Sequence, residues 1–118
     1  MSAPAWIAVG LLGGAASVAR YLLGGFVTAA GRAGFPLGTL AVNVSGALAL
    51  GVLIGLRVHG TALVLLGTAM LGAFTTFSTW MLESDRLGRY ERLGPATVNI
   101  VASLVAGVAA VALGRLLG

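Results

Sequence analysis

The chain has 118 residues, of which 58% are hydrophobic and only 8% charged, against about a quarter charged in soluble domains, so water is not its main solvent. It contains no Cys, which excludes disulfide frameworks, thiolate metal sites and thiol nucleophiles. The net charge of +4 is spread over loops and helix ends rather than gathered in one basic stripe, so nucleic acid is not expected as a partner.

Four stretches are long and apolar enough to cross a bilayer, which takes about 20 residues at about 1.5 Å each. They cover residues 5–29, 37–56, 62–82 and 96–117, with Gly, Pro or charged residues between them. No basic residue precedes the first apolar run, so we expect a retained helix rather than a signal peptide. The sequence predicts an all-α integral membrane protein, with residues 1–118 as one transmembrane domain of four helices.

Glycines lie inside the apolar runs, with the GxxxG pairs Gly10–Gly14 and Gly51–Gly55. This spacing lets a neighbouring backbone approach closely, so it predicts tight helix packing or a dimer. The alternative is that membrane helices are simply rich in Gly.

Charge gives only a weak preference for one orientation in the membrane. Two arginines lie on the side of the N-terminus and four on the other, and the acidic residues contribute little to this bias. Two copies could therefore insert in opposite directions and pair about a two-fold axis in the membrane plane. The arginines are Arg57 and Arg115 on one side, and Arg32, Arg86, Arg89 and Arg92 on the other.

Polar residues in the first two spans are the first candidates for a functional site. Arg20 either reaches the interface along its own stem or lines an aqueous vestibule that concentrates anions. In the second span, Thr39 and Asn43 share a helix face. The Asn43 amide either bonds a neighbouring helix or contacts a solute.

The third span contains four hydroxyl residues within five positions, which is unusual for a helix interior. Together with the preceding Gly72, they predict a broken helix near mid-membrane whose free carbonyls need a donor or a cation. Phe74, Phe77 and Trp80 recur every three residues, which indicates either a packed stripe or ring edges that attract an anion. The hydroxyl residues are Thr75, Thr76, Ser78 and Thr79.

In the fourth span, Asn99, Ser103 and Gly107 recur every four residues and form one stripe along the predicted helix. The stripe is interpreted as a polar track. Ser103 alone would be weak evidence, because a serine hydroxyl can bond its own helix backbone.

With these motifs, the sequence strongly resembles the Fluc (CrcB) fluoride channels over nearly the whole chain. The resemblance implies an antiparallel dual-topology homodimer, multi-pass in the inner (plasma) membrane and embedded in the lipid bilayer, with two pores through which fluoride leaves the cytoplasm. It rests on GG followed by Arg20 and Tyr21, on GTLAVNVSG, on GAFTTFSTW with Glu83, and on Ser103 with Gly107.

The resemblance also implies a structural sodium ion at the dimer centre, held by backbone carbonyls that map to Gly72 and Thr75. It places the family's aromatic box at Phe77 and Trp80, where phenylalanine is usual at the second position. Tyrosine is common in the family where this chain has Asn99. The residues expected along the fluoride pathway are Asn43, Thr76, Phe77, Ser78, Thr79, Trp80, Asn99 and Ser103, with Arg20 in the vestibule.

The main alternative is a small multidrug-type proton-coupled antiporter, which has a similar length and also four helices. Such a protein needs a carboxylate inside the membrane, whereas Glu83, Asp85 and Glu91 lie at or beyond the predicted end of the third helix. A second alternative is a membrane subunit that only packs against other proteins. Enzymatic activity is not expected, because the only histidine, His59, lies in a short loop and no carboxylate pair is spaced for acid-base work.

Overall fold

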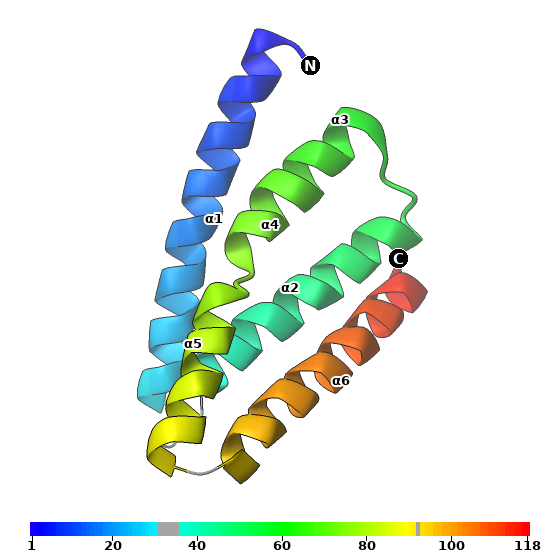
Figure 1. The fold of residues 1–118 in the computed structure, drawn as a ribbon. Coiled ribbons are helices and arrows are strands. Elements are labelled where there is room, and N and C mark those ends of the chain that lie inside the picture. Colours follow the sequence, from blue (N-terminus) through cyan, green and yellow to red (C-terminus); the bar gives the residue numbers. More distant parts are fainter. Residues whose placement is uncertain (31–35, 92) are drawn as a thin grey trace.

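The computed structural model describes residues 1–30, 36–91 and 93–118, with the side chains of Ser78, Tyr90 and Glu91 left out of the description. It is all-helical, and four of its helical segments are long and apolar enough to cross a membrane, as predicted. The segments run up and down beside one another (Figure 1), and the longest dimension of the molecule is 49 Å. They are α1 (Ala3–Ala30), α2 (Leu37–Gly55), a composite third segment of which Gly60–Arg89 is the candidate span, and α6 (Leu93–Leu117).

The third segment is bent, and its break divides it into two parts. Thr75 is extended, with φ −80° and ψ 161°, so the chain leaves the helix after Phe74 and re-enters it at Ser78. The segment continues past the predicted end at Leu82. Its first part consists of α3 (Gly60–Leu63), the π-helix η1 (Val64–Leu71) and α4 (Gly72–Phe74), and its second part of α5 (Ser78–Arg86) and the π-helix η2 (Leu87–Glu91).

Glycines hold α2 and α6 together. A Cβ added at Gly51 would overlap the Val111 carbonyl, and one added at Gly114 would overlap the Leu48 carbonyl. The close packing predicted for Gly51 and Gly55 is therefore confirmed, since backbone meets backbone where a methyl group would not fit. Gly10 and Gly14 of α1 meet nothing within 4 Å inside the subunit.

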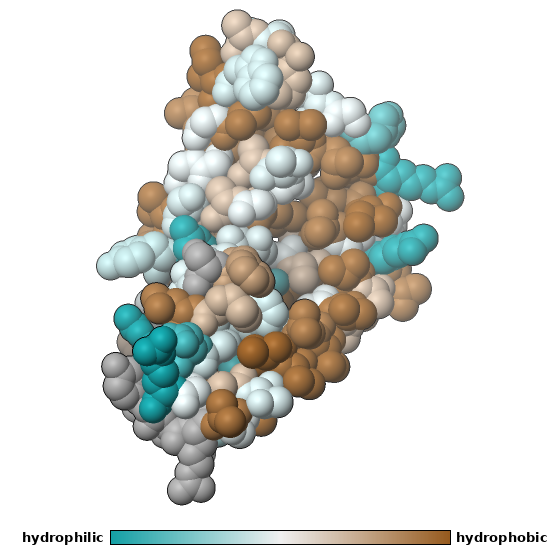
Figure 2. Space-filling model, viewed as in Figure 1, coloured by the Kyte–Doolittle hydropathy of each residue, from teal (hydrophilic) through white to brown (hydrophobic). Residues whose placement is uncertain are grey.

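The surface is mostly apolar, as expected when lipid or a partner protein replaces water as the surroundings. Exposed hydrophobic side chains include Trp6, Phe26 and Val105. Figure 2 shows brown, hydrophobic atoms spread over much of this face, whereas the teal, hydrophilic atoms lie mainly at its right edge and at its lower left.

Several charged side chains lie at two opposite ends of the helical segments. Arg57 and Arg115 lie at the end where α2 and α6 finish, and at the opposite end Arg89 forms an exposed ion pair with Asp85 at 2.9 Å. Arg32 and Arg92 lie outside the described residues. A dual topology in the membrane stays a prediction.

Candidate functional site

The break in the third segment is paired with the side chain of Asn43. The Thr76 N–H donates to Asn43 Oδ1 at 2.8 Å, and Asn43 Nδ2 donates to the Thr76 carbonyl at 2.9 Å. A carboxamide has one acceptor oxygen and an NH₂ group, so it matches both polar groups of one residue's backbone. Asn43 of α2 therefore satisfies the residue that the broken helix leaves unpaired.

These bonds release two carbonyls. In a continuous helix, the Thr76 N–H would donate to the carbonyl of Gly72, and the Thr79 N–H to that of Thr75. Instead, the first donates to Asn43 and the second to the Thr76 hydroxyl at 3.3 Å. The carbonyls of Gly72 and Thr75 thereby lose their helical donors, and they are the oxygens that the family resemblance implies as sodium ligands.

Two features fix the geometry of the break: one closes the end of α4, and the other packs the break against α2. The backbone N–H and the hydroxyl of Thr75 both donate to the Leu71 carbonyl at 3.0 Å, which closes the end of α4. Gly46 of α2 leaves room for Thr75 and for the Phe74 ring, because an added Cβ would overlap the Thr75 methyl group. The GTLAVNVSG motif thus provides both the amide and the space that the break requires.

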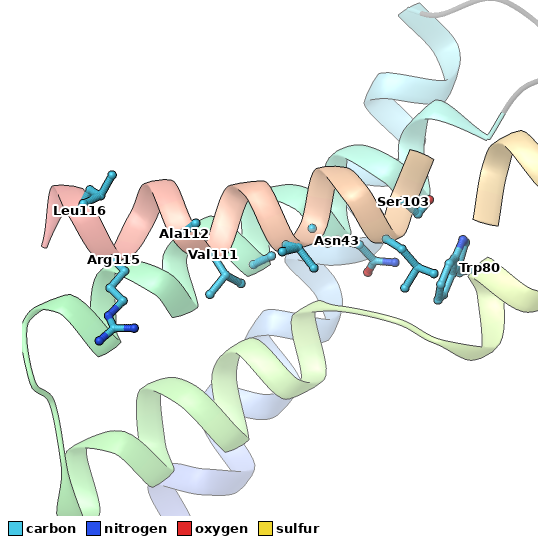
Figure 3. A pocket seen from close by; sticks show the side chains of 11 residues that line it. Asn43, Trp80, Ser103, Val111, Ala112, Arg115 and Leu116 are labelled. Carbon is cyan, nitrogen blue, oxygen red and sulfur yellow. The ribbon is translucent and has the colours of Figure 1, made fainter. Parts of the chain in front are cut away.

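A groove of about 850 Å³ runs along α6 and is here named the α6 groove. Figure 3 shows Asn43, Trp80 and Ser103 toward one end of it and Arg115 toward the other, with Val111 between them. Residues from three helices therefore converge there, and the polar groups of Asn43 and Ser103 lie among mostly apolar lining residues, with the charged Arg115 at the far end.

The aromatic stripe of the third span is split by the break. Phe74 packs over Gly46 inside the subunit, whereas Phe77 points outward and is 70% exposed. Phe77 and Trp80 meet edge to face, with ring centroids 5.8 Å apart and planes at 81°. Such a pair presents electropositive ring edges.

A second hollow of about 560 Å³ lies on the α1 side of the break and is here named the α1 hollow. Arg20, Thr76 and Thr79 line it, and so do Thr39 and Glu83, whose hydroxyl and carboxylate are hydrogen-bonded to each other. The Arg20 Nε is buried and has no hydrogen-bond partner among the described residues. The break thus separates a hollow that contains both signs of charge from the α6 groove.

Asn99 is buried between α5 and α6, with 1% of its surface exposed. Its Nδ2 donates to the Ser84 hydroxyl at 2.8 Å, and that hydroxyl donates to the Trp80 carbonyl at 2.9 Å. The Trp80 indole N–H in turn donates to the Asn99 carbonyl at 3.4 Å. Sequence reasoning missed Ser84, although it follows Trp80 by four residues, the spacing at which a helical hydroxyl bonds back to its own backbone.

The residues expected along the fluoride pathway therefore lie in several different parts of the subunit. Asn43, Trp80 and Ser103 share the α6 groove, Thr76 and Thr79 face the α1 hollow with Arg20, and Phe77 lies beside Trp80. Asn99 lies behind Trp80, and the side chain of Ser78 is outside the described part. Among the described residues, no group of three or more His, Asp or Glu side chains could hold a metal ion.

Comparison with known proteins gives consistent matches over most of the chain. Residues 7–115 match the family described as CrcB-like protein, Camphor Resistance (CrcB). The chain is 51% identical over 110 residues to the fluoride-specific ion channel FluC 2 of Mycolicibacterium paratuberculosis, covering 93% of this chain and 90% of that protein. It is 48% identical over 118 residues to FluC 1 of Rubrobacter xylanophilus, covering 98% and 95%.

The pairing between Asn43 and the break predicts a stability effect. Asn43→Leu removes both hydrogen bonds and leaves two backbone groups of Thr76 unpaired, at a typical cost of about 1 to 3 kcal/mol for each buried group. We expect a lower midpoint of thermal unfolding in detergent, followed by circular dichroism. The control is Ser45→Ala, because the exposed Ser45 hydroxyl only bonds back to Val42 of its own helix. Equal midpoints for Asn43→Leu and the parent would contradict the pairing.

Proposed function

The chain belongs to the CrcB-like family, and from this membership and its fluoride-channel relatives we propose that it is a fluoride-specific ion channel of the plasma membrane. The fluoride would leave the cytoplasm down its electrochemical gradient. The observation that carries the proposal is the α6 groove, where an amide, a hydroxyl and an indole converge inside a multi-pass membrane protein. The alternative of a proton-coupled antiporter has no support in these comparisons.

Neutral donors suit the passage of a small and strongly hydrated anion. Conduction requires sites that replace the ion's water yet release it again, and a fixed cation at the narrowest point would hold it too tightly. The Asn43 amide nitrogen has two protons, and only one of them is needed for the Thr76 carbonyl. The second proton and the Ser103 hydroxyl are the donors that we assign to fluoride in the α6 groove.

Aromatic edges and hydroxyls would complete the path. The exposed Phe77 and the Trp80 ring offer electropositive edges next to Asn43, which attract an anion without binding it tightly. Thr76 and Thr79 line the α1 hollow, and we propose that their hydroxyls serve the path where it passes the break. The Ser78 hydroxyl remains a further candidate.

Arg20 would supply the anion-attracting vestibule. It lines the α1 hollow near the break, and its charge would raise the local concentration of anions before they reach the neutral donors. Glu83 lines the same hollow and engages the Thr39 hydroxyl, so the net field there depends on both charges.

A second copy of the chain would complete each pore. The α6 groove and the Phe77 ring are open to the outside of the subunit, and α1 carries Gly10 and Gly14 with nothing within 4 Å. Because the arginine bias is small, we propose an antiparallel homodimer with two pores, each lined by both subunits.

The freed carbonyls of Gly72 and Thr75 are proposed ligands of a structural sodium ion on the dimer axis. Carbonyl oxygens suit a hard cation, and two subunits would supply four of them. The bonds that Asn43 and Thr76 make with the N–H groups of Thr76 and Thr79 support this assignment, because they leave both carbonyls without a helical donor. The positive charge of the ion would link the broken third helices of the two subunits.

The channel function is tested with purified protein in liposomes loaded with fluoride. When a potassium ionophore dissipates the charge, a fluoride electrode should record rapid release, whereas matched liposomes loaded with chloride should release little. The physical reason is that the donors are arranged for the smaller ion. Equal release of chloride would overturn the assignment.

The dual topology predicts accessibility from both sides of the membrane. The chain has no Cys, so a single cysteine can be introduced at His59, in the exposed loop between α2 and α3. In intact cells an impermeant thiol reagent should label about half of the copies, and permeabilisation should expose the rest. Complete labelling, or none, before permeabilisation would show a single orientation.

The role of Phe77 is tested by Phe77→Ile, which keeps an apolar side chain but removes the electropositive ring edge. We expect a severe loss of fluoride flux from a protein that still elutes as the parent does in size-exclusion chromatography. The control is Leu65→Ile in the π-helix η1. This variant should conduct like the parent, because Leu65 lines neither the α6 groove nor the α1 hollow. Parental flux through an intact Phe77→Ile protein would place the ring outside the pathway.

A further inference from the structure

Three hydrogen bonds link Trp80, Ser84 and Asn99 into a closed loop, here named the indole clamp. Asn99 Nδ2 donates to the Ser84 hydroxyl, which donates to the Trp80 carbonyl, and the Trp80 indole N–H returns to the Asn99 carbonyl. Ser84 is 5% exposed and Asn99 is 1% exposed, so the loop is enclosed between α5 and α6. The clamp therefore ties the ring of Trp80 to the backbone of the facing helix.

The clamp determines which part of the indole an ion in the α6 groove can meet. Trp80 lines the groove beside Asn43 and Ser103 (Figure 3). Its N–H is the only conventional hydrogen-bond donor in the Phe77 and Trp80 pair. Because this N–H is engaged by the Asn99 carbonyl, what remains for the groove is the weakly electropositive edge of carbon-bound hydrogens.

The hydrogen bonds of the Ser84 and Asn99 side chains matter because the hydrogen bond from the Trp80 indole to the Asn99 carbonyl is long. At 3.4 Å it lies beyond the usual range for N–H···O bonds, so it is weak and easily exchanged for a better acceptor. The shorter bonds of 2.8 and 2.9 Å through Ser84 fix α6 against α5 and keep the carbonyl within reach of the ring. A fluoride ion is a strong competing acceptor, since hydrogen bonds to an ionised partner are roughly twice as strong as neutral ones.

We propose that Ser84 and Asn99 are positioning residues that keep the Trp80 N–H out of the fluoride pathway, so that the ion passes the indole without being held by it. This inference rests on the proposed function. It gives Asn99 a role through Trp80 rather than as a lining residue, and it makes the indole behave toward the ion as a hydrocarbon ring does.

Fluorescence tests the clamp independently of conduction. In a Trp6→Phe background Trp80 is the only tryptophan, because the chain contains two. Asn99→Leu and the smaller change Ser84→Ala should each shift the Trp80 emission maximum, and sodium fluoride should change that emission in the variants but not in the parent. Thr97→Val removes an exposed polar group from the same part of α6 and should alter neither signal. Unchanged emission in both clamp variants would overturn the proposal.

Flux measurements distinguish a positioning role from direct contact. Asn99→Leu is compared with its parent in two liposome series, one with Trp80 and one with Trp80→Phe. We expect the variant to lower fluoride flux several-fold with Trp80, and to have little further effect with Trp80→Phe, which has no N–H to release. The same fold-loss in both series would mean that Asn99 acts on the ion directly and would refute the proposal.

The two failures can be told apart. If the parent releases no fluoride from liposomes, the channel assignment fails, and the proposal about the pathway fails with it. If the parent conducts but the clamp variants retain parental flux and emission, only the indole clamp is refuted. Where Asn99→Leu does not give an intact dimer, Ser84→Ala supplies both readouts.

Discussion

A bilayer supplies no water to a backbone that leaves its helix, so the extended stretch around Thr75 and Thr76 must find its hydrogen-bond partners within the protein. The arrangement of the third segment against α2 depends on how these hydrogen-bond partners are provided. The amide of Asn43 takes the place of a peptide group for Thr76, and Gly46 allows the break to approach α2 closely. The same exchange of partners removes the helical donors of the two carbonyls proposed for sodium, so the proposed anion path and the proposed cation site would share one physical origin.

The membrane character, the four spans and the bend of the third helix could be predicted from the sequence, because each depends on local composition. Long apolar runs need a bilayer, and hydroxyl residues crowded after Gly72 weaken a helix. The hydrogen-bond partner of each polar group could not be predicted from the sequence. The alternatives for Asn43 were a neighbouring helix or a solute, and the structure shows the first while leaving one amide proton for the second.

Asn99 shows most clearly where sequence periodicity stops being informative. It lies on the same four-residue repeat as Ser103 and Gly107, yet only Ser103 and Gly107 reach the α6 groove, while Asn99 bonds Ser84 of α5. The repeat identifies a helix face but not what covers each turn of it. Likewise, the two GxxxG pairs look equivalent in sequence, but within the subunit only that of α2 meets a neighbouring backbone. Both differences, within the four-residue repeat and between the GxxxG pairs, arise from neighbouring helices in the tertiary structure, which the sequence does not reveal.

The double engagement of Asn43 has a consequence for how such a protein can diverge. One side chain pairs with the break and, under the proposed function, also supplies a donor to the groove, so a change of residue there is expected to alter folding and permeation together. Ser103 also lines the groove, but no hydrogen bond from it is seen within the described chain, so it does not have a structural role in addition to its proposed role in the ion path. Evolutionary tuning of the ion path is therefore expected to proceed through the α6 face and the aromatic pair, with the amide as the fixed point around which these substitutions accumulate.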